Sequence, residues 1–302
     1  MRSLLKKIPG MFSLYLFIRK FNTFQVIDIE SINQQLQQVL FNQHQLNLQL
    51  GKKIYGDISQ AGFRCYSQLE EDGILLYVLS IIGMKTKKVV EICMGSGDEC
   101  MAANLILNHG YQGFLFDGDD QNVKRAEKFY KSKKDCLLTP PLIRRAWVTK
   151  NNINELLCEI GAQGEVDVLS LDIDGNDYYI WEAITEINPR LCIFETHNVV
   201  PNELSLTIPY EDNFDCWSKE GADQDFRGVS LLAMKKLSAK KGYRLIGAHK
   251  HGFNVFFLRN DISQDFFPEV SVESVHNNFS TQIAQKERWP LVKDKKWINV
   301  GD

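Results

Sequence analysis

Hydrophobic residues from position 64 onward fall into short continuous runs that alternate with longer stretches of helical spacing. The runs predict buried strands, and the stretches between them predict helices that cover a sheet. Because consecutive strands are separated by helix-length segments, the sheet should be parallel and doubly wound. The expected strands are 88–93, 113–117, 145–149, 166–172 and 191–195, with helices at about 98–109, from 121 onward, and from the capping box Ser67–Glu70 to about Ile82.

Two further runs, Tyr243–Gly247 and Asn254–Leu258, are joined by only a few residues. A parallel crossover needs about a dozen residues or more, so this pair must form an antiparallel hairpin. The pattern therefore predicts an α/β fold with a doubly wound, mostly parallel, seven-stranded sheet of Rossmann-like type. An antiparallel C-terminal hairpin closes this sheet.

The region before the sheet has a different period. Apolar residues alternate at spacings of three and four, which is the a/d seam of a coiled coil over about three heptads. Isolated helices of this length are marginal in water, so the seam must be buried on a copy of the helix or on the chain's own sheet-containing domain. We expect the copy, and hence a homo-oligomer through residues 29–50. The seam consists of Ile29, Ile32, Leu36, Val39, Gln43, Leu46 and Leu50.

Residues 1–20 contain five basic and no acidic side chains around the apolar run Met11–Ile18. This run is too short to span a bilayer and lacks a signal-peptide cleavage site. It favours peripheral contact with an anionic membrane surface, and packing on the protein's own body is the alternative. Gly51 and Gly56 mark the expected boundary between an N-terminal helical appendage, residues 1–56, and the domain that contains the sheet, residues 57–302.

Composition narrows the class of protein. The formal net charge of −3 and the isoelectric point of about 6.1 argue against a protein that wraps nucleic acid, so we expect no nucleic-acid partner. The seven cysteines are odd in number and form no CxxC pair, which is typical of reduced thiols. We therefore expect a cytoplasmic protein, with any membrane contact at the inner face.

A glycine turn, Gly95-Ser96-Gly97, follows the first predicted strand, and Asp117 ends the second strand. Glycines allow a tight turn close to a ligand, and a carboxylate at the second position can accept both hydrogen bonds of a ribose diol. An NAD site shows the same pair. The third glycine of the dinucleotide motif would fall at Cys100, however, which disfavours that alternative.

The segment Glu91–Gly97 resembles the first motif of class I S-adenosylmethionine-dependent methyltransferases, an acid followed by a glycine-rich turn. It departs from that motif at Cys93, where glycine is common. The closing hairpin is also expected of this family and not of ordinary dinucleotide-binding domains. The resemblance is closest to the FkbM-like group, covers about residues 64–260, and is carried further by 66–74, 116–120, 146–149 and 166–175.

The resemblance implies S-adenosylmethionine as cofactor, with the acid near its methionine end and the glycines near its ribose. It also implies an acceptor hydroxyl on a sugar of a glycan or glycolipid, and hence a place in polysaccharide biosynthesis. The cofactor residues expected on this basis are Gln68, Glu91, Gly95, Ser96, Gly97, Asp117, Gly118, Trp147 and Asp172.

Acidic side chains follow the fourth and fifth predicted strands. Asp172 and Asp174 lie two residues apart, as do Glu195 and His197, and such pairs point the same way on extended backbone. The three carboxylates suit Mg²⁺ or another divalent ion, which would lower the pKa of an acceptor hydroxyl. The alternative is that Asp172 orients the cofactor and the others bind loops. His197 is the candidate general base, since an ordinary histidine titrates near neutral pH. The predicted catalytic residues are thus Asp174, Glu195 and His197.

Three classes of function remain open. The first is methyl transfer to a sugar hydroxyl, with or without a metal. The second is an NAD(P)-dependent oxidoreductase, disfavoured by Cys100 and by the hairpin. The third is a non-catalytic scaffold in a glycan-assembly complex, disfavoured because Glu91, both glycines and Asp117 are intact.

Overall fold

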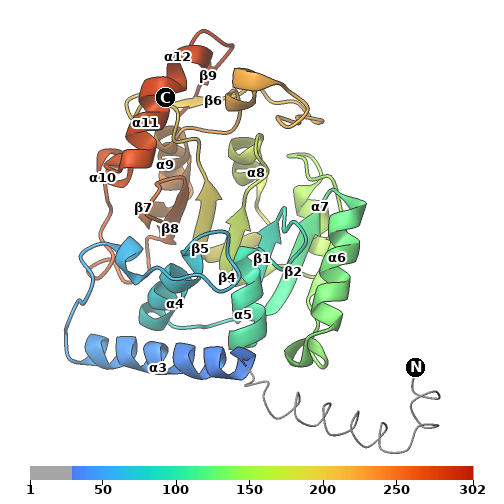
Figure 1. Cartoon of the computed structure of the whole chain (residues 1–302), viewed down its shortest axis with the longest axis vertical. Helices are drawn as coiled ribbons and strands as arrows, with labels where there is room; N and C mark the ends of the chain where they lie inside the picture. The colour runs from blue at the N-terminus through green and yellow to red at the C-terminus, as the bar shows by residue number, and fades with distance from the viewer. Residues whose placement is uncertain (1–28, 302) are drawn as a thin grey trace, which may run out of the picture.

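A computed structural model describes residues 29–301, so the basic segment 1–20 lies outside the described residues. Its centre is a seven-stranded sheet in the order β3-β2-β1-β4-β5-β8-β7 (Figure 1). Strands β1 to β5 are parallel, and β8 is antiparallel to both of its neighbours, which confirms the predicted fold. The strands are β1 Lys88–Ile92, β2 Gln112–Asp117, β3 Leu142–Arg145, β4 Gly164–Leu171, β5 Ile187–Glu195, β7 Tyr243–Ala248 and β8 Asn254–Arg259.

Helices cover both faces of the sheet, each with its own apolar cluster. Apolar side chains of α4, α5 and α6 pack in one cluster, and those of α7, α8 and α9 pack in the other. The first set is α4 Glu71–Ile82, α5 Met101–His109 and α6 Asp120–Lys131; the second is α7 Ile153–Glu159, α8 Asp177–Ala183 and α9 Leu231–Lys240, with short 3-10 helices at Ile58–Ala61, Lys134–Cys136 and Gly221–Asp225. Strand order reverses between β1 and β4, where doubly wound sheets open a crevice for ligands.

The last part of the chain returns over the carboxyl ends of the strands, and the sequence pattern predicted no element there (Figure 1). Its short antiparallel sheet pairs β6 Leu206–Thr207 with β9 Ile298–Asn299. Three helices lie between these two strands in the sequence, near the C-terminus: α10 Val272–His276, α11 Phe279–Glu287 and α12 Trp289–Val292. Ser280 and Ala284 of α11 line a cavity at this edge of the sheet.

Two predicted boundaries were wrong. The third strand ends at Arg145, where β2 also ends at its partner Asp117, so Trp147 and Val148 lie in a loop. The helix α4 begins at Glu71 without the predicted capping box. Instead, the Asp72 carboxylate accepts hydrogen bonds from the three consecutive backbone amides of residues 65–67.

Helix α3, Ile29–Gln49, lies along the bottom of the molecule in Figure 1, below α4 and α5 and away from the carboxyl ends of the strands. It contacts the body of the protein through specific hydrogen bonds, such as that from Gln34 Nε2 to the carbonyl of Leu107 at 3.0 Å. Within residues 29–301, none of the helices has the length and apolar content needed to cross a bilayer.

Candidate active site

Two cavities adjoin each other at the carboxyl edge of the sheet. The first cavity, about 360 Å³, lies between the ends of β1 to β4 and the segment 214–217. The second cavity, about 500 Å³, lies between the ends of β4 and β5, the segment 68–69 and helix α11. Asp174 and Trp217 line both, so two ligands bound side by side would meet there.

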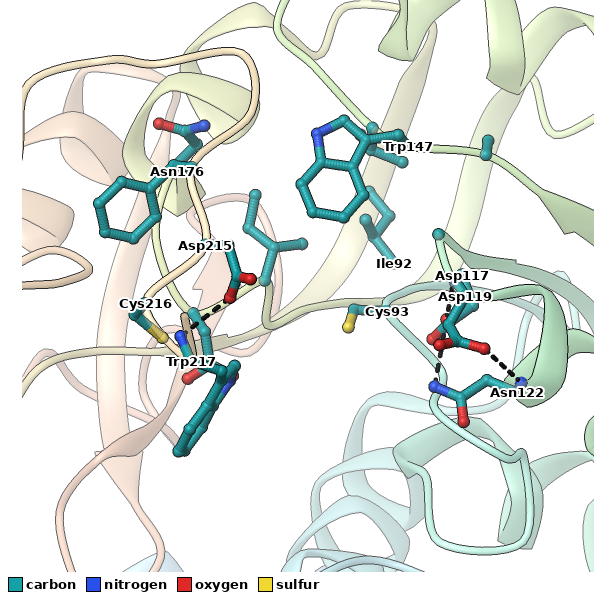
Figure 2. Close-up of a pocket in the computed structure, with 16 residues that line it drawn as sticks. Ile92, Cys93, Asp117, Asp119, Asn122, Trp147, Asn176, Asp215, Cys216 and Trp217 are labelled. Atoms are coloured by element: carbon teal, nitrogen blue, oxygen red, sulfur yellow. Dashed lines mark hydrogen bonds between the residues drawn. The ribbon is translucent and has the colours of Figure 1, made fainter. Parts of the chain in front are cut away.

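The first cavity is largely apolar. Trp147 and the Asp117–Asn122 segment form one side, residues 215–217 form the other, and Cys93 lies between them (Figure 2). The Trp147 indole donates to the carbonyl of Asp212 at 2.7 Å, which ties the β3 loop to the opposite wall. A Cβ at position 118 would lie 2.7 Å from this indole, so Gly118 allows the close approach. The cavity's size and apolar walls fit a nucleoside.

Asp117 is the acid at the end of β2. Its Oδ2 accepts from the amide of Gly95 at 2.9 Å, while its Oδ1 accepts from the amide of Asp119 at 2.9 Å and from Asn122 Nδ2 at 3.3 Å. A carboxylate oxygen has two acceptor positions, so Oδ2 keeps one for a ligand. Burial raises the pKa of this carboxyl group. Asp117 thus shapes the loops and offers one acceptor to the first cavity.

The glycine turn supports the cavity without lining it. The Glu91 carboxylate is buried and accepts from the amides of Met101 and Ala102 at 2.9 and 2.7 Å, which fixes the start of α5. Gly95 and Gly97 have φ of +58° and +76°, where a side chain is strained. Neither cavity is lined by Glu91, Gly95, Ser96 or Gly97. These residues shape the loop beside the first cavity, and their direct contact with the cofactor stays a prediction.

Cys93 was not predicted as a site residue. Its φ of +71° is left-handed, the region that favours the glycine usually found at this motif position. Its side chain reaches the first cavity, and burial followed by the charge of Asp172 raises its thiol pKa well above the ordinary value.

A carboxyl pair lies in the second cavity. Asp172 and Glu195 are hydrogen-bonded to each other, which requires a proton between them. Burial and the charge of Asp174 raise the pKa of Asp172 to about 6, and burial and the charge of Asp172 raise the pKa of Glu195 well above its ordinary value. The bond between them lowers the pKa of Asp172 and raises that of Glu195, so Glu195 is the donor of the pair and Asp172 the acceptor.

Asp174 is held at the border of the two cavities. Its Oδ1 pairs with Arg227 Nη1 at 2.5 Å, and its Oδ2 accepts from Trp217 Nε1 at 2.9 Å. The backbone of Asp174 is left-handed, with φ of +55°. Asp177 fixes this turn by accepting from the amides of Ile173 and Gly175, both at 2.9 Å, so Asp177 is a loop residue.

Oxygen atoms of Asp172, Asp174 and Glu195 all lie within 4.8 Å of one another, as a metal site requires. These carboxyl oxygens nevertheless already have hydrogen-bond partners within the protein. Arg227 and Trp217 each donate to one oxygen of Asp174, and Asp172 and Glu195 bond to each other. A divalent ion at this position would have to displace the Arg227 guanidinium from Asp174 and the proton that Asp172 and Glu195 share, and the predicted metal stays an alternative to this paired arrangement.

His197 lines the second cavity but lacks the properties expected of a general base. Its Nε2 lies 2.8 Å from the carbonyl of Asp225, so this nitrogen carries the hydrogen and donates it. Burial, followed by the charge of Arg227, lowers the pKa of the imidazole to about 4. The prediction assumed an ordinary histidine, and the buried position removes that basis.

Other walls of the second cavity come from distant parts of the sequence. Gln68, predicted to bind the cofactor, lines this cavity instead of the first. Helix α11 and the residue after it contribute one face at spacings of four, and the hairpin and the β5 loop add further side chains. The additional lining residues include Asn198, Arg227, His251, Phe253, Ser280, Ala284 and Arg288. Because α11 lies more than 80 residues after β5, no local sequence motif predicted that its residues would line this cavity.

No protein-family model matches the chain, and no curated protein does. Solved structures similar to it include the magnesium protoporphyrin IX methyltransferase ChlM of Synechocystis PCC 6803 with bound S-adenosylmethionine, at 9% identity and a TM-score of 0.39 over 62% of this chain and 77% of that one. The N-terminal domain of EvdMO1 with S-adenosylhomocysteine is 13% identical, with a TM-score of 0.40 over 66% of this chain and 90% of that one. A methyltransferase from Methanosarcina mazei is 9% identical, with a TM-score of 0.38 over 60% of this chain and 96% of that one. For other neighbours the matched share of their own chain falls to about half.

Likenesses this distant say nothing about activity. The strand order, with antiparallel β8 between β5 and β7, is itself the arrangement of class I methyltransferases. The chain thus has the Rossmann-like methyltransferase fold, and its function has to be argued from the two cavities.

Proposed function

We propose that this chain transfers a methyl group from S-adenosylmethionine to a hydroxyl group of a sugar. The observation that carries the proposal is the contact between the two cavities at Asp174 and Trp217. The first cavity suits a nucleoside, with apolar walls, the Trp147 indole and a carboxylate acceptor on Asp117. When bound, S-adenosylmethionine supplies a methyl group on a positively charged sulfur, which becomes a neutral thioether as the methyl group leaves.

The acceptor oxygen must lose its proton as it gains the methyl group. Asp172 is ionised at neutral pH and lines the second cavity, so it is the proposed general base. Glu195 is a positioning residue, because its hydrogen bond holds the Asp172 carboxylate in one orientation. Arg227 keeps Asp174 in place and balances its charge. The proton of the acceptor hydroxyl therefore ends on Asp172.

The walls of the second cavity favour an uncharged polyol. Gln68, Asn198 and Ser280 offer hydrogen-bonding groups, and Phe253 and Trp217 offer flat apolar surfaces for the C–H face of a sugar ring. Both lining arginines are paired with acids, Arg227 with Asp174 and Arg288 with Asp225. Among the described lining residues no guanidinium is left for a phosphate, so we expect the methylated sugar unit to be neutral.

A divalent ion on Asp172, Asp174 and Glu195 is the second candidate for activating the hydroxyl, favoured by the 4.8 Å clustering of their oxygens. Turnover with and without EDTA separates the two. A carboxylate base predicts a rate indifferent to chelation. A metal site predicts loss of turnover and recovery with Mg²⁺ or Mn²⁺.

Calorimetry with S-adenosylhomocysteine and with NAD tests the first cavity. Binding of the former and not the latter supports a methyltransferase, and the reverse supports the oxidoreductase. A panel of neutral and phosphorylated sugars and sugar lipids, with S-adenosylhomocysteine formation as readout, tests the acceptor class. Cofactor binding without product on any acceptor would leave the scaffold interpretation standing.

A further inference from the structure

Helix α3 is amphipathic in the reverse of the usual sense. Its polar side faces the protein: the Gln37 amide exchanges hydrogen bonds with the Asn104 amide at 2.9 and 3.0 Å, and both side chains are buried. The His44 ring is buried edge-on against Tyr77, with ring centroids 5.1 Å apart. These directional contacts fix the rotation of the helix, so its other face cannot turn inward.

The outward face carries the apolar residues of the heptad seam. Ile32, Leu36 and Val39 are 44%, 59% and 64% exposed, and Leu46 and Leu50 are 49% and 58% exposed. They follow one another at a and d positions, interrupted only by the exposed Gln43. Large aliphatic side chains rarely form a continuous exposed stripe on a monomer. We call these six residues the α3 stripe.

The absence of charged residues around the α3 stripe indicates which kind of partner binds it. Residues 31–51 contain no Asp, Glu, Lys or Arg, and Glu30 at the start of the helix is paired with Lys133. An anionic membrane surface would call for lysines or arginines along both sides of the stripe, whereas the nearest ones, Lys52 and Lys53, lie beyond its last residue. A charged partner would call for complementary charges. A second copy of the same stripe, flanked by uncharged Gln and Asn, is self-complementary and free of like-charge repulsion.

We propose that two copies of this chain associate through the α3 stripe, helix against helix, with Gln43 facing its counterpart. Twenty-one residues give a helix of about 31 Å, enough for roughly three heptads of side-chain interlocking. Such an interface is smaller than a standard one, so we expect association of moderate strength. Since α3 lies at the edge of the sheet away from the carboxyl ends, both cavities stay open in the pair (Figure 1).

Sedimentation equilibrium of the full chain across a wide range of concentrations tests the proposal. The wild-type chain should be a dimer that dissociates on dilution. Leu36→Glu places two carboxylates in the interface and should weaken association by at least about 100-fold. Gln38→Glu adds the same charge on the same helix outside the stripe and is the matched control, with little change expected. Circular dichroism and S-adenosylhomocysteine affinity should be unchanged in both variants.

A second variant works in the opposite direction. Gln43→Leu completes the apolar seam and should tighten the dimer, since a polar residue at a buried a position costs stability. A wild-type chain that is monomeric at every concentration overturns the proposal, as does a dimer that Leu36→Glu and Gln38→Glu weaken equally. A monomer would mean that the stripe is covered by residues 1–28 of the same chain or by another partner.

Discussion

The two cavities share the wall residues Asp174 and Trp217 but are otherwise lined by different kinds of residue. The first cavity is shaped by backbone turns, small residues and aromatic rings, with Asp117 as a carboxylate whose acceptor positions are mostly used by the protein. The second cavity is lined by ionisable groups that are paired with one another, such as Asp172 with Glu195. The first design suits binding by shape, and the second suits the handling of a proton. Substitutions in the two should therefore change different kinetic quantities.

The largest effect is expected for Asp172→Asn. Loss of the carboxylate removes the proposed base but keeps the shape and a hydrogen-bonding partner for Glu195. We expect kcat to fall about 100- to 10,000-fold, with S-adenosylhomocysteine affinity changed less than about threefold. Steady-state kinetics and calorimetry on one preparation measure both. An equal loss in cofactor affinity would instead assign Asp172 to the cofactor.

The pH profile should report the same group. The pKa of Asp172 is raised to about 6, so below that pH the carboxyl is protonated and cannot accept a proton. We expect kcat/KM to fall about tenfold for each pH unit below about 6. Glu195→Gln keeps a hydrogen-bond donor to Asp172 and should preserve this acid limb. A profile that stays flat well below pH 6 in the wild-type enzyme would exclude Asp172 as the base.

A smaller effect is expected for Asp117→Asn, in the first cavity. The substitution keeps the size of the side chain but removes its charge. It also replaces one of the two acceptor oxygens by an NH₂ group, which cannot accept a hydrogen bond. We expect S-adenosylhomocysteine to bind about 10- to 100-fold more weakly, with the KM for the acceptor unchanged. Asp120→Asn is the matched control, since Asp120 pairs with Lys124 outside the cavity. Equal affinities in the two variants would refute the assignment of Asp117.

The smallest effect concerns Cys93. A left-handed conformation costs a residue with a side chain about 1 kcal/mol, and glycine avoids that cost. Cys93→Gly should thus raise the free energy of unfolding by about that amount, measured by urea denaturation. Cys93→Ala removes the thiol and keeps the strained backbone, so it should show no gain. A gain in both variants would attribute the effect to the thiol.

Much of the sheet could be predicted because β1, β2, β4 and β5 are buried, mostly apolar runs, and the acids just after the strands had to gather at one edge, whereas the exposed β3 was predicted with the wrong bounds. Asp117, Asp172, Asp174 and Glu195 were found on this basis, and all four line a cavity. The glycine turn was placed correctly in the sequence. Glu91 bonds to an amide at the start of α5 and Gly97 packs against Ala126, so both residues shape the loop, and the contact of the turn with the cofactor stays a prediction.

The site residues that the sequence did not predict were missed for one physical reason. Arg227 meets Asp174 across 53 positions of sequence, and Arg288 directly follows α11, beyond the closing hairpin. Their segments have no regular apolar period, so spacing alone could not bring them to the site. His197 was placed in the right cavity, but its pKa depends on burial by those same segments. Similarly, the α3 heptads were visible in the sequence, whereas the direction in which they face was not.

The shared wall has a thermodynamic consequence. A ligand in the first cavity that displaces Trp217 or Asp174 changes the shape and charge of the second, because both residues line both cavities. Any such coupling must be reciprocal: if the nucleoside alters acceptor affinity by some factor, the acceptor alters nucleoside affinity by the same factor. Trp217, through its bond to Asp174, is thus a point at which occupancy of one cavity is communicated to the other.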